Sequence, residues 1–77
     1  MTYDLTPDDY LQLAEDSRRR TATIKPDTPM NCYDIEACRV FEDTMHELAA
    51  GRGTFEALIA EMFRRQKALT VQFGVNP

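Results

Sequence analysis

The chain contains 77 residues, carries a net charge of −4, and is 43% hydrophobic and 29% charged. This composition excludes a disordered tail and a membrane-spanning protein, and the acidic balance excludes general affinity for nucleic-acid phosphates. A chain of this length supports one hydrophobic core, so we expect a single, marginally stable domain over residues 1–77.

The first predicted helix covers residues ~7–20. Thr6 is a good N-cap, Pro7 suits the first helical position, and two aspartates follow at the positive end of the helix dipole. The helix has a modest apolar face and ends in three arginines, close to the negative end of the dipole. Residues 21–30 contain two prolines and several β-branched residues, which predict an extended connector.

The second and third predicted helices cover residues ~32–50 and ~54–72. Asn31 is expected to cap the second helix, in which apolar residues recur at spacings of three and four. Gly51 and Gly53 leave room only for a tight turn, which predicts an antiparallel helical hairpin. The predicted fold class is therefore all-α. The shorter N-terminal helix is expected to pack across this hairpin or onto a partner copy, because two helices leave each apolar stripe half covered.

The chain carries no pattern typical of catalysis or metal binding. Cys32 and Cys38 are six positions apart on one predicted helix, where they face about 120° away from each other and cannot form a disulfide. The one histidine, His46, has no zinc-ligand spacing around it, and an ion pair with Glu42 explains it better than acid–base chemistry. We expect no enzyme activity, metal or cofactor. Without a signal peptide or a bilayer-spanning run, we also expect a cytoplasmic location and no membrane contact.

The densest positive charge in the chain lies in one short segment, made of Arg18, Arg19, Arg20 and Lys25. Consecutive arginines cannot all face one way on a helix, so one interpretation is a solvated face that neutralises the helix dipole. A second is a site for an anionic molecule such as a nucleotide, with Tyr10 or Tyr33 as a stacking surface. A third is contact with an acidic protein.

Small apolar residues form a line on the third predicted helix, and a similar line lies on the second. Small residues permit close helix approach, so these lines are expected either to receive the first helix or to form an interface with another copy or a different protein. The interface residues predicted in this way are Tyr33, Ala37, Val40, Ala57, Ala60, Ala68 and Val71. The small core favours homodimerisation through the hairpin as a route to stability.

These features predict a non-enzymatic protein–protein interaction module that acts as a small regulator or inhibitor. In size, acidity and helical content the chain is similar in general character to the small accessory proteins of phages and mobile elements, which often inhibit or redirect a host protein. That likeness covers size and composition only. Two alternatives stay open: a binder of a small anionic ligand through the arginine segment, and a structural component of a larger assembly.

Overall fold

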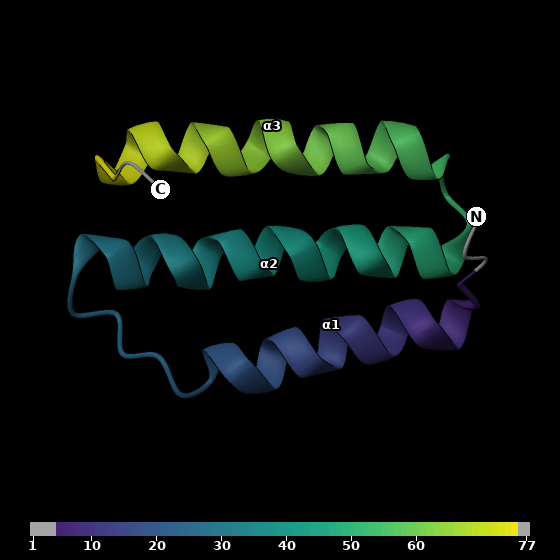
Figure 1. Cartoon of the computed structure of the whole chain (residues 1–77), viewed down its shortest axis with the longest axis horizontal. Helices are drawn as coiled ribbons and strands as arrows, with labels where there is room; N and C mark the ends of the chain where they lie inside the picture. Colours follow the sequence, from purple (N-terminus) through teal and green to yellow (C-terminus); the bar gives the residue numbers. More distant parts are fainter. Residues whose placement is uncertain (1–4, 76–77) are drawn as a thin grey trace.

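The structure, a computed structural model, describes residues 5–75 and consists of three α-helices joined by two short connections. Helix α1 spans Pro7–Thr21, α2 spans Pro29–Ala50 and α3 spans Phe55–Phe73 (Figure 1). The prediction of an all-α chain is confirmed, since residues 5–75 contain three helices and no strand. None of the described helices combines the length and the hydropathy needed to cross a membrane.

A threonine caps the start of each helix. The hydroxyls of Thr6, Thr28 and Thr54 each accept a hydrogen bond from the backbone amide three residues further on, which satisfies one of the free amides of the first turn. Helix α2 begins three residues before the predicted position 32, because Thr28 caps it and Pro29 takes the first helical position. The prediction that Asn31 is the cap was wrong, since Asn31 lies in the first turn and its amide donates to Thr28.

The turn between α2 and α3 depends on Gly51. This glycine has a φ of 68°, and its amide donates to the carbonyls of Glu47 and Leu48. A residue with a side chain meets a steric penalty at this φ, whereas glycine does not. The end of α2 at Gly51 therefore agrees with the sequence analysis, and Gly74 ends α3 in the same conformation.

Helix α2 lies between the other two helices (Figure 1). After the glycine turn, α3 runs back along one side of α2, and Gln66 Nε2 donates to the Ala37 carbonyl at 3.1 Å. Helix α1 packs along another side of α2, and within residues 5–75 it makes no contact with α3. The expectation that α1 packs across the hairpin is thus corrected, because α1 packs on α2 alone, while packing onto a partner copy stays a prediction. The apolar residues of α2 spread over more than half of its circumference, so α1 and α3 cover different sides of it.

The core is small. Ala14 and Ser17 of α1 are each 2% exposed, and their small side chains allow α1 to approach α2 closely. The other buried residues are Val40, Thr44, Met45 and Met62. None of the large side chains among the described residues is fully enclosed, so much of the apolar surface of this chain faces solvent.

Candidate interaction surfaces

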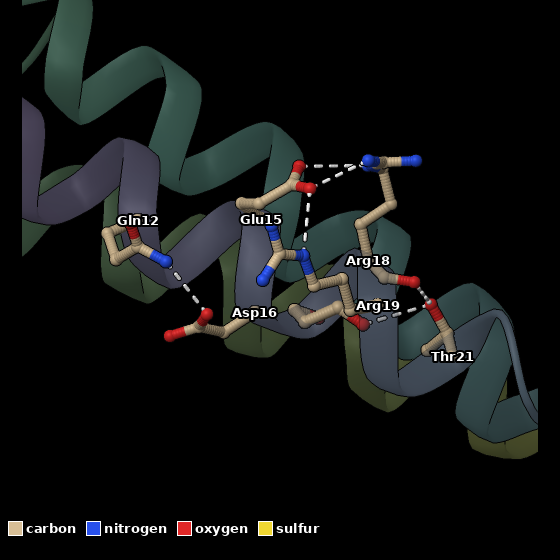
Figure 2. Close-up of polar contacts among 7 residues, drawn as sticks. Gln12, Glu15, Asp16, Arg18, Arg19 and Thr21 are labelled. Atoms are coloured by element: carbon tan, nitrogen blue, oxygen red, sulfur yellow. Dashed lines mark hydrogen bonds and ion pairs between the residues drawn. The ribbon is translucent and has the colours of Figure 1, made fainter.

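Two of the clustered arginines share one carboxylate within α1 (Figure 2). Nε and Nη2 of Arg18 donate to Glu15 at 3.0 and 2.7 Å, and Nε of Arg19 donates to the same carboxylate at 3.2 Å. The hydrogen bond from Arg18 lowers the pKa of Glu15, and the same bond raises the pKa of Arg18. The positive charge of this pair is therefore partly neutralised by their own helix.

The remaining residues proposed for an anion site are spread out. Arg20 and Lys25 are exposed, and within residues 5–75 neither takes part in an ion pair. Tyr10 lies in the first turn of α1, ten positions before Arg20, which is about 15 Å along the helix axis. Tyr33 lies near the start of α2 and is half-buried. The structure does not bring Tyr10 together with Arg20 and Lys25 around one small ligand.

The predicted interface residues of α2 are largely occupied within the chain. Val40 is buried in the core, and the backbone of Ala37 accepts the hydrogen bond from Gln66 of α3. Tyr33 and Ala37 are half-buried. This part of the predicted interface serves mainly to hold the three helices together.

The predicted interface residues of α3 are free. Ala57, Ala60, Ala68 and Val71 are all exposed, and the exposed fraction of Val71 is 82%. Because α1 does not contact α3, the interpretation that this line receives α1 is wrong. The other interpretation, an interface with a second molecule, stays a prediction.

An open hollow between α2 and α3 brings together charged residues that the sequence analysis did not connect. Asp43 and His46 of α2 line it together with Glu61 and Arg65 of α3, and Arg65 pairs with Asp43 across the two helices at 3.5 Å. His46 is exposed, and in the described part of the chain no ion pair joins it to Glu42. The register between two helices brings these groups together, and spacing along one helix carries no information on that register.

Several large apolar residues on the outer helices, Leu11 and Phe55 among them, were missed as surface candidates. Phe63 of α3 is 60% exposed and Leu13 of α1 is 40% exposed. Because these residues are apolar, a sequence analysis places them in the core, and composition alone does not indicate that they are exposed. The available signal is the width of the apolar face of α3, which is broader than one neighbouring helix can cover.

These surfaces define a small three-helix protein with one central helix and two outer helices whose far sides are uncovered. Compared with models of protein families, with curated proteins and with solved structures, the chain matches none of them.

Proposed function

We propose that this chain is a non-enzymatic interaction protein that acts by binding a partner protein, as a small regulator or inhibitor does. One observation carries the proposal: the described residues bury few apolar side chains and leave many large ones at the surface. The exposed large hydrophobic residues are Leu5, Leu11, Leu13, Met30, Phe55, Phe63 and Val71. Large apolar side chains at the surface favour contact with a partner protein, because their burial against it is favourable.

The partner surface favoured by this observation is the outer side of α3. Val71 is the most exposed of the large apolar residues, and the alanines at positions 57 and 68 leave the helix backbone accessible beside it. Arg64 lies in the same line, with its side chain 75% exposed and bonded to Glu61. A partner helix with small or apolar residues would pack closely here, and the arginine would add a polar contact at the edge.

The experiment is affinity capture from native lysate with the wild-type chain and with Val71→Glu, followed by mass spectrometry. A carboxylate at this position makes apolar burial unfavourable without touching the buried core. We expect the wild type to retain a specific protein and Val71→Glu to lose it, whereas Arg39→Glu, on the exposed side of α2, retains it. Equal capture by all three chains, or capture of nothing by the wild type, would count against the proposal.

The two cysteines agree with an intracellular role. Cys32 and Cys38 are both free thiols, and neither is fully buried. Free thiols persist in reducing compartments, so we propose the cytoplasm as the place of action.

A further inference from the structure

The outer helices carry two exposed strips whose end charges match. On α1 the strip is Asp9, Leu13, Asp16 and Arg20, and on α3 it is Glu56, Ala60, Phe63 and Lys67. Spacings of four, three and four place each strip along one side of its helix. Each strip begins with an acid and ends with a base eleven positions later. Between these ends lie Ala60 and Phe63 on α3, and Leu13 and a second acid, Asp16, on α1. The acid and the base are about 16 Å apart along the axis.

Both strips lie on the same side of the three-helix layer, which we call the open face. The hollow with Asp43 and His46 marks the opposite side, and Arg65 contacts Asp43 from that side of α3. Arg18 lies on the side of α1 away from the strip, and Glu42 of α2 is near enough to contribute, after Glu15, to the raised pKa of Arg18. Glu42 lies one turn before His46 and therefore towards the hollow. At 100° per residue, the strips then fall on the other side of the layer.

The middle of the open face is apolar. Ala37 lies nine positions before His46, which is 180° around α2, so it faces away from the hollow. Phe41 and Leu48 lie on the same side of α2 and are only half-buried, although they belong to its main apolar stripe. Leu13 and Phe63 stand exposed on either side of them. A helical layer with an apolar side is stable when a second layer covers it.

The charges at the two ends of the open face determine which orientation of a second copy is favourable. Helices α1 and α3 begin at the same end of α2, so Asp9 and Glu56 lie towards one end of the face, while Arg20 and Lys67 lie towards the other (Figure 1). A second copy placed in the same direction would set acid against acid. A second copy turned by 180° sets the acid end of each strip against the base end of the same strip.

We propose that the open face is a self-association site, covered by a second copy of this chain turned by 180°. Glu56 then faces the partner's Lys67, and Asp9 faces the partner's Arg20, each contact occurring twice by symmetry. The molecule extends 37 by 24 by 23 Å, so the open face can offer at most on the order of 800 Å² from each copy, which is the size of a standard stable interface. This inference goes beyond the proposed function, since it assigns a second surface, separate from the one around Val71, to a particular partner.

Analytical ultracentrifugation from micromolar to millimolar concentration tests the proposal. We expect a reversible dimer for the wild type and about tenfold weaker self-association for Lys67→Glu and for Glu56→Lys, because each variant sets like charges together twice. An equimolar mixture of the two variants should restore the wild-type affinity, since every contact then joins opposite charges. Arg39→Glu, with the same charge change on the far side of α2, should dimerise as the wild type does.

Three results would overturn the proposal: a wild type that stays monomeric, a Lys67→Glu variant that dimerises as tightly as the wild type, or a mixture no tighter than its components. Circular dichroism on each variant checks that the helices are intact. The Val71→Glu capture experiment fails or succeeds separately, because Val71 lies outside both strips. A monomeric chain that still captures a partner through Val71 would end the self-association proposal and leave the proposed function standing.

Discussion

The hydroxyl of Ser17 gives the sharpest test of how α1 packs on α2. Ser17 is 2% exposed, and its Oγ has no hydrogen-bond partner. Thr44 of α2 is buried to a similar extent, but its hydroxyl donates to the Val40 carbonyl at 2.9 Å. Replacing each residue with alanine removes a buried hydroxyl in both cases, and the two changes should alter the free energy of unfolding in opposite directions.

The expected magnitudes follow from the state of each hydroxyl. An unpaired buried polar group costs about 1–3 kcal/mol, and alanine favours a helix over serine by about 0.5 kcal/mol. The void left by one oxygen atom offsets only a few tenths of a kcal/mol, so Ser17→Ala should stabilise the chain by about 1–3 kcal/mol. Thr44→Ala loses a hydrogen bond and a buried methyl group, and it should destabilise the chain by about 1 kcal/mol.

Thermal unfolding followed by circular dichroism measures both changes. For a domain of this size each kcal/mol moves the Tm by about 4–8 °C, so the two variants should separate clearly on either side of the wild type. Protein concentration is held constant, because self-association would add to apparent stability. A neutral or destabilised Ser17→Ala chain, beside a Thr44→Ala chain that behaves as expected, would refute the reasoning about the Ser17 hydroxyl.

Three further changes test the helix ends and the ion pairs. Thr28→Ala should lower the free energy of unfolding by about 1 kcal/mol in urea titration, because it removes the N-cap of α2; Asn31→Ala should cost less, and the reverse order would restore Asn31 as the cap. Gly51→Ala should lower the free energy of unfolding by about 1 kcal/mol through backbone strain alone, since the added Cβ would meet no atom within 4 Å. An unchanged Tm would contradict the positive φ of this residue. Arg18→Ala should raise the pKa of Glu15 towards 4.5 in an NMR titration. Because the folded-state pKa of Glu15 is lowered, the stability from this pair is present above pH 4.5 and is lost as the pH falls through that lower value, so wild type and variant should converge in strong acid.

Helix positions were predictable from the sequence because helix ends carry local signals. Thr6 with Pro7 fixed the start of α1, and Gly51 fixed the end of α2. The start of α2 was missed although Thr28 and Pro29 repeat the signal of α1. Asn31 is an equally good cap by type, and only the conformation of the connector decides between the two.

The arrangement of the helices was not predictable in the same way. Each helix has an apolar stripe, but a stripe does not say which neighbour covers it. The small residues Ala14 and Ser17 allow α1 to approach α2 closely, and this contact draws α1 to α2 alone. Because α1 packs on α2 alone, no helix of the described chain reaches that side of α3, and Phe63 is therefore exposed.

A chain with one central helix and two outer helices faces a geometric constraint that links its stability to its function. Helix α2 has a neighbour on two sides, and its remaining stripe, with Phe41 and Leu48, is only partly covered. Covering that stripe within the chain would require a fourth helix, whereas a second copy covers it with no added residue. Burial of Leu13 and Phe63 in the same contact would add apolar area at about 25 cal/mol per Å² in both copies. The strips at the edges then decide the direction of pairing, because only the reversed arrangement sets Lys67 against an acid. The partly covered apolar side of α2 thus leaves the monomer weakly packed, and together with the charged strips beside it would make the dimer specific.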